Sequence, residues 1–159
     1  RGIVPKQYNI YTQIYPIQAI DDSLRINMDA LYDAIYNTLK HNQTSENSSV
    51  TLILSNDSYL KTLNQKYVGI DTSTDVLSFQ SNEKCYLGDV ILSVEYALRT
   101  ANIRSHTLIE ELQILTVHGI LHLLGYTHES NDDSEKMWKI QKHILSTLKN
   151  HTEHSYKQI

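Results

Sequence analysis

The residues with the clearest capacity for chemistry are three histidines between His118 and His128. His118 and His122 are four residues apart, so on a helix they project from one face with Cβ atoms roughly 5–6 Å apart. Two imidazoles at that spacing can each reach one metal ion at about 2.0–2.1 Å. Gly125 can end the helix in a left-handed conformation and turn the chain, which would bring His128 towards the pair. The spacing therefore predicts one Zn²⁺ per chain, bound at the end of a long helix.

Three neutral imidazoles leave one coordination position of zinc open, where a water can be held with its pKa lowered to about 7. This arrangement is typical of a catalytic site rather than a closed structural one. The alternative is that the histidines are chance neighbours on a partly buried helix face. The other five histidines lack such spacing, and we interpret them as surface or hydrogen-bonded residues: His41, His106, His143, His151 and His154.

The same histidine spacing occurs in metzincin proteases, so proteolysis is a competing hypothesis. Gly119 stands where those enzymes carry the glutamate that acts as general base, and glycine has no proton acceptor. A glycine inside a helix costs about 1 kcal/mol relative to alanine, so an advantage must offset it. Space for a substrate and tight packing of the helix are equally good explanations.

Length and composition indicate one domain over residues 1–159, of which 150–159 form a polar tail. The 159 residues include no apolar run of the roughly 20 residues that span a membrane, and no secretory signal layout, so we expect a cytoplasmic protein. The net charge of −4 argues against nonspecific nucleic-acid binding and requires any RNA contact to come from a local patch. Cys85 is alone, so it is interpreted as a packing residue.

Hydrophobic periodicity predicts an α/β (α+β) fold, with a small mixed β-sheet packed by about five helices. Capping residues mark three helix starts, at Asn27, at Asn56 and at Thr107 with Glu110. Gly69 and Gly125 mark two helix ends. The strands are expected at 8–14, 50–54, 76–79 and 89–93, and the helices at 28–39, 57–68, 94–102, 108–124 and from about 137 to 148.

The stretch His118 to His128 resembles the signature of the YbeY family, His-Gly-x-Leu-His-Leu-x-Gly-Tyr-Asp-His. Residues 69–79 are similar to a second motif of that family, and residues 87–90 to a third. The motifs follow the family's order within residues 50–148, whereas the first 49 residues match only in general layout. On these motifs the chain is identified as a member of the YbeY family.

The resemblance implies a metal-dependent hydrolase that is a single-strand-specific, zinc-dependent endoribonuclease. Its expected role is rRNA processing, including maturation of the 16S rRNA 3′ end, and ribosome quality control. The family's zinc ligands match His118, His122 and His128, and His118 is also expected to be catalytic. The implied partners are ribosomal RNA and proteins of the small ribosomal subunit, with no membrane and no DNA. Zinc could polarise a phosphate oxygen, or activate a water or the ribose 2′-hydroxyl.

Val68 departs from the family pattern, which usually has arginine at this position. Arginine could hold a phosphate bidentately and stabilise developing charge, which valine cannot do. Lys61 or Lys66 could substitute for it. The alternative is a noncatalytic zinc-containing ribosome-assembly factor, in which Val68 marks lost activity.

Thr127 replaces the family's usual aspartate before the last histidine, which removes a carboxylate that could orient a ligand. Glu129, Asp132 or Asp133 could serve instead. Ser73 and Gln80 stand where prolines are common, and we expect them to affect loop stiffness more than chemistry.

Two aspartates in the shared motifs, Asp75 and Asp89, are candidate catalytic residues that could orient a ligand or bind a water. Their alternative role is to cap a loop and a strand, which we favour for each. Four basic residues are candidate RNA contacts, with an ordinary solvated helix face as the alternative: Lys61, Lys66, Arg99 and Arg104.

Overall fold

The computed structural model describes residues 5, 7–72 and 74–148, which form a four-stranded sheet and five α-helices. The predicted α+β architecture is thereby confirmed, while the expected tail at 150–159 and Ser73 lie outside the described residues. The elements are β1 (Asn9–Ile14), α1 (Met28–His41), β2 (Ser49–Ser55), α2 (Asp57–Leu63), a π-helical turn η1 (Asn64–Val68), β3 (Val76–Gln80), β4 (Tyr86–Ser93), α3 (Val94–Arg104), α4 (Leu108–Leu123) and α5 (Asn131–Ser146).

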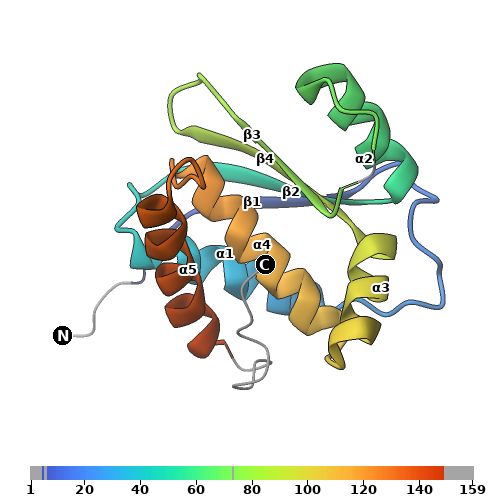
Figure 1. Ribbon diagram of the computed structural model, residues 1–159. Helices are drawn as coiled ribbons and strands as arrows, with labels where there is room; N and C mark the ends of the chain where they lie inside the picture. Colours follow the sequence, from blue (N-terminus) through green and yellow to red (C-terminus); the bar gives the residue numbers. More distant parts are fainter. Residues whose placement is uncertain (1–4, 6, 73, 149–159) are drawn as a thin grey trace.

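The sheet has the strand order β1-β2-β4-β3. β1, β2 and β4 are parallel, and β3 runs antiparallel to β4 at the edge. Figure 1 shows α1, α3, α4 and α5 on one side of this sheet and α2 on the other side. The edge strand β3 lies beside α4, the helix that carries the predicted metal ligands, because Ser78 of β3 donates to the Gly119 carbonyl of α4.

Helix α4 is buried on nearly its whole surface, which explains its continuous apolar sequence. One side of it, with Leu112 and Leu115, packs against Leu52 and Val90 of the two central strands. The opposite side joins a second apolar cluster with α5, formed by Ile114, Val117, Leu121, Met137, Ile144 and Leu145. Because α4 is enclosed by the sheet, α1, α3 and α5, the packing of these elements fixes the direction of its side chains.

The predicted caps are confirmed. Asn27, Asn56 and Thr107 each accept a hydrogen bond from the backbone NH three residues later. Within the described residues, no helix combines the length and apolar character that crossing a membrane requires.

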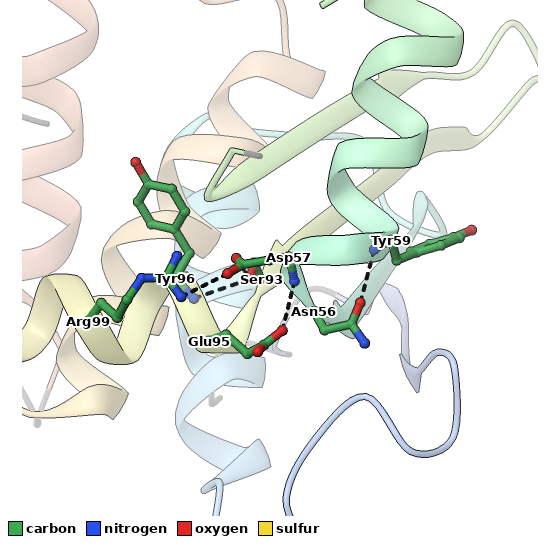
Figure 2. A network of polar contacts seen from close by, with 7 residues as sticks. All are labelled: Asn56, Asp57, Tyr59, Ser93, Glu95, Tyr96 and Arg99. Carbon is green, nitrogen blue, oxygen red and sulfur yellow. Dashed lines mark hydrogen bonds and ion pairs between the residues drawn. The ribbon is translucent and has the colours of Figure 1, made fainter. Parts of the chain in front are cut away.

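The amino ends of α2 and α3 are joined by the polar network in Figure 2. Asp57 accepts hydrogen bonds from Ser93 Oγ and from Arg99, both at 2.7 Å. Glu95 in turn accepts from the backbone NH of Asp57 at 2.9 Å. Each helix therefore contributes a carboxylate to the other, which fixes α2 against the rest of the fold.

Two details of the β3–β4 hairpin differ from the sequence predictions. β4 begins at Tyr86 and runs through Gly88, whose φ of +136° is closed to most residues and whose hydrogen points at the Phe79 carbonyl. Glycine here permits the close approach of β3 and β4, and β4 starts three residues before the expected residue 89. Cys85 is exposed, so its interpretation as a packing residue is wrong, because it lies in the turn with φ +65°.

Candidate metal centre

Helix α4 ends immediately after the second histidine, in a Schellman motif. Gly125 takes φ +99°. Its NH donates to the His122 carbonyl, and the NH of Tyr126 donates to the Leu121 carbonyl. The predicted left-handed glycine is confirmed, and the chain after it reverses towards α5 and carries His128 back to the helix.

The three imidazoles meet through their Nε2 atoms. His118 Nε2 lies 3.0 Å from His122 Nε2 and 3.3 Å from His128 Nε2. Nitrogens bound to one tetrahedral zinc at about 2.0–2.1 Å stand about 3.3 Å apart, so the observed spacing fits such an ion. His118 and His122 are half-buried and His128 is exposed, which leaves the centre accessible from the His128 side.

Each histidine has a partner at its other ring nitrogen. Nδ1 of His118 lies 2.9 Å from Gln141 Oε1, and Nδ1 of His122 lies 2.8 Å from the Tyr126 carbonyl. Nδ1 of His128 lies 3.4 Å from Ser134 Oγ. A carbonyl acceptor at Nδ1 keeps the proton there and leaves Nε2 free to bind a metal. The donor set is therefore prepared for a cation at the common centre.

Electrostatics favour neutral rings as well. Burial, together with the neighbouring His122, lowers the pKa of His118 to about 4. Burial also lowers the pKa of His122. Two of the rings are consequently unprotonated at neutral pH, which is the form that binds a metal.

Comparison with known proteins gives the family of the chain and agrees with its fold. The family described as Endoribonuclease YbeY matches residues 17–149. The chain belongs to the YbeY family.

The chain is 35% identical over 139 residues to "Endoribonuclease YbeY" of Pelotomaculum thermopropionicum, covering 82% of this chain and 90% of that protein. It is 34% identical over 152 residues to "Endoribonuclease YBEY, chloroplastic" of Arabidopsis thaliana, covering 84% of this chain but only 26% of that longer protein. The solution structure of TM1509 from Thermotoga maritima superposes with a TM-score of 0.59 at 26% identity, over 86% of this chain and 87% of TM1509.

Gly119, in the YbeY signature, serves packing between α4 and the sheet. A Cβ at this position would lie 2.5 Å from Val90 Cγ1, 3.2 Å from Ser78 Oγ and 3.3 Å from Val76 Cγ2. Ser78 Oγ also donates to the Gly119 carbonyl at 2.9 Å. Of the two explanations for this glycine, tight helix packing is the correct one.

The departures from the YbeY pattern have specific structural settings. Gln80 Nε2 lies 3.2 Å from the His122 carbonyl and 3.3 Å from that of Leu123, and donates to both. Gln80, which was expected to affect loop stiffness, thus binds the end of α4 that carries His122. In the described part of the chain, the Nδ1 partner of His128 is the Ser134 hydroxyl. His128 forms no hydrogen bond with the three carboxylates that could have compensated for Thr127, which are Glu129, Asp132 and Asp133.

Val68 ends the π-helical turn with half of its surface exposed. The two lysines considered as substitutes have other contacts. Lys61 Nζ lies 4.0 Å from a carboxylate oxygen of Asp71, and Lys66 lies over the ring of Tyr67 at 5.1 Å from its centroid. The structure gives no contact between either lysine and the histidine triad.

The two candidate aspartates lie on different parts of the sheet. Asp75 directly precedes β3, and burial raises its pKa above the ordinary value in spite of backbone hydrogen bonds. Asp89 lies within β4, where its carboxylate accepts a hydrogen bond from the Tyr86 hydroxyl. Neither forms a hydrogen bond with a histidine of the triad, so their catalytic role stays a prediction.

The two arginines are engaged within the protein. Arg99 pairs with Asp57 at 2.7 Å and also packs over the ring of Tyr96. Arg104 lies 3.8 Å from Glu111, which also contacts His106 at 2.5 Å. An RNA contact by either arginine would have to compete with these pairs, and all four predicted RNA contacts remain predictions.

Sequence reasoning did not identify the residues that orient the ligands, Gln141 and Ser134. Both lie on α5, outside the signature motif. The only available signal was a polar residue in the apolar stripe of α5, since Gln141 follows Met137 by four residues and precedes Ile144 by three. A buried glutamine at such a position indicates an unseen hydrogen-bond partner.

Proposed function

We propose that this chain is a zinc-dependent, single-strand-specific endoribonuclease that acts in rRNA processing, including 16S rRNA 3′ end maturation, and in ribosome quality control. The observation that carries the proposal is the convergence of three Nε2 atoms, two of whose rings are oriented by carbonyl acceptors. The endoribonuclease names of the YbeY relatives support the reaction class.

His118, His122 and His128 would hold the metal through Nε2. Bound zinc supplies a Lewis acid for a phosphate oxygen and an acidified water or hydroxyl group. The chain contributes neutral imidazoles, because burial keeps His118 and His122 unprotonated. It also contributes an open approach beside the exposed His128. Gly119 supplies no general base, so peptide hydrolysis of the metzincin type is disfavoured.

We further propose ribosomal RNA and proteins of the small ribosomal subunit as partners, a cytoplasmic location, and no role for a membrane or for DNA. YbeY family membership supports the proposed partners.

The second candidate is a noncatalytic zinc-containing ribosome-assembly factor. The observation that favours it is Val68, because a half-exposed aliphatic side chain there cannot hold a phosphate as arginine would.

Cleavage assays on the zinc-loaded protein separate the two candidates. The protein is incubated with labelled single-stranded and duplex RNA, beside His118→Ala and the matched control His143→Ala, which removes an exposed histidine of α5. We expect cleavage of single strands by the wild type and the control, loss of cleavage by His118→Ala, and about one zinc per chain. Wild-type protein that holds zinc but leaves every RNA intact contradicts the nuclease.

Val68→Arg tests the assembly factor. If the chain has lost activity through Val68, this substitution should create or strongly increase cleavage while binding to small ribosomal subunits is unchanged. Failure of the wild type to associate with ribosomal particles would remove the second candidate.

A further inference from the structure

We propose that Gln141 is the main positioning residue of the metal centre and that α5, which carries no ligand, sets the affinity of the site for zinc. The inference rests on the metal-binding part of the proposed function and not on RNA cleavage. It assigns a role to a helix that lies outside the signature motif.

The contact between Gln141 and His118 is short and enclosed. Gln141 Oε1 lies 2.9 Å from His118 Nδ1, and Gln141 is only 4% exposed. The amide oxygen can only accept a hydrogen bond, so the ring must carry its proton on Nδ1. Nε2 of His118 is then the unprotonated nitrogen, and it is the atom that lies near Nε2 of both other histidines.

A second orienting group lies on the same face of α5. Ser134 precedes Gln141 by seven residues, which is close to two helical turns. Its Oγ lies 3.4 Å from Nδ1 of His128, a longer and more exposed contact than that of Gln141. Gln141 is therefore the stronger of the two partners that α5 provides.

The position of Gln141 is fixed by apolar packing around it. Met137, one turn before it, and Ile144 and Leu145, on the next turn, are buried against Ile114, Val117 and Leu121 of α4. Because α4 carries His118 on the turn next to these contacts, the docking of α5 determines the distance between the amide and the imidazole. Loss of such an outer partner typically weakens metal binding by about 10–100-fold.

The test measures zinc affinity by competition with a chromophoric chelator, for wild type, Gln141→Leu, Gln141→Glu and Gln113→Leu. Leucine removes the acceptor and glutamate retains it. Gln113→Leu is the matched control, because Gln113 is a buried glutamine of α4 whose amide donates to the Ala30 carbonyl at 2.8 Å and not to a histidine. Circular dichroism establishes which variants are folded.

We expect zinc binding by Gln141→Leu to be about 10–100-fold weaker, with an altered absorption spectrum of the Co²⁺-substituted protein. Gln141→Glu should bind zinc at least as tightly as wild type. The zinc affinity of Gln113→Leu should lie within about twofold of the wild-type affinity. Wild-type affinity in folded Gln141→Leu, equal weakening in Gln113→Leu, or equal weakening in Gln141→Glu would each overturn the proposal.

One measurement needs no variant. Long-range ¹H–¹⁵N spectra of the metal-free wild type should show His118 as the Nδ1–H tautomer, and the Nε2–H tautomer would overturn the proposal even if Gln141→Leu does not fold. These readouts are independent of RNA. A wild type that binds zinc without cleaving RNA contradicts the nuclease alone.

Discussion

Gly119→Ala tests whether the glycine between the two helical ligands exists for packing. The added methyl group would lie 2.5 Å from Val90 Cγ1, about 1 Å closer than carbon atoms pack at best. Val90 is fully buried on a central strand and its branched side chain has few alternative rotamers, so the helix or the strand must move.

Two opposing terms set the change in unfolding free energy that Gly119→Ala causes. Alanine is favoured over glycine in a helix by about 1 kcal/mol, whereas overpacking a filled core costs about 1–3 kcal/mol. Since the overlap involves a stiff side chain and two further tight contacts, we place the cost at about 2 kcal/mol. The net expectation is a loss of about 1 kcal/mol in the free energy of unfolding of the metal-free protein.

Denaturant unfolding of a double-mutant cycle with Val90→Ala measures this overlap directly. In the Val90→Ala background the clash is relieved, so Gly119→Ala should become neutral or stabilising, with a coupling energy of about 1–2 kcal/mol. Val50→Ala is the control. Val50 is as buried as Val90 and lies in β2, but none of its atoms is among the three nearest to a Cβ at position 119. Stabilisation by Gly119→Ala alone, or equal rescue by Val50→Ala, would refute the packing explanation.

Two further predictions concern the ends of helices. Gly125→Ala places a side chain at φ +99° and should cost about 1–2 kcal/mol in unfolding free energy, with weaker zinc binding because the turn to His128 is strained; unchanged stability and affinity would contradict this. Asp57→Asn tests the pH dependence of the network in Figure 2. Burial acts to raise the pKa of Asp57, but the hydrogen bonds from Arg99 and Ser93 prevail and lower it below its ordinary value of 3.8. A depressed folded-state pKa gives stability that is present above the unfolded-state pKa and lost as pH falls through the folded-state pKa. Asp57→Asn should therefore be less stable than wild type at pH 7, by about 1 kcal/mol since Arg99 is exposed, and the difference in unfolding midpoint should vanish in acid; a difference independent of pH would contradict the assignment.

The sequence alone determined the features that depend on local spacing. Two histidines four residues apart share a helix face in any α-helix, and Gly125 supplies the left-handed residue that a Schellman motif favours. The caps at Asn27, Asn56 and Thr107 are local in the same sense, because each bonds a backbone NH only three residues away. Such features do not require knowledge of distant contacts.

The tertiary structure decided everything that joins residues far apart in the chain. Gly119 could have served a substrate or a packed strand, and only the approach of Val90, 29 positions earlier in sequence, distinguishes the two. The sequence offered Arg99 as a candidate RNA contact, and only the structure shows that it pairs with Asp57. Gln141 reaches His118 only because apolar contacts dock α5 on α4. Periodicity specifies which face of a helix is buried, but the partner that covers that face depends on how all the elements pack together.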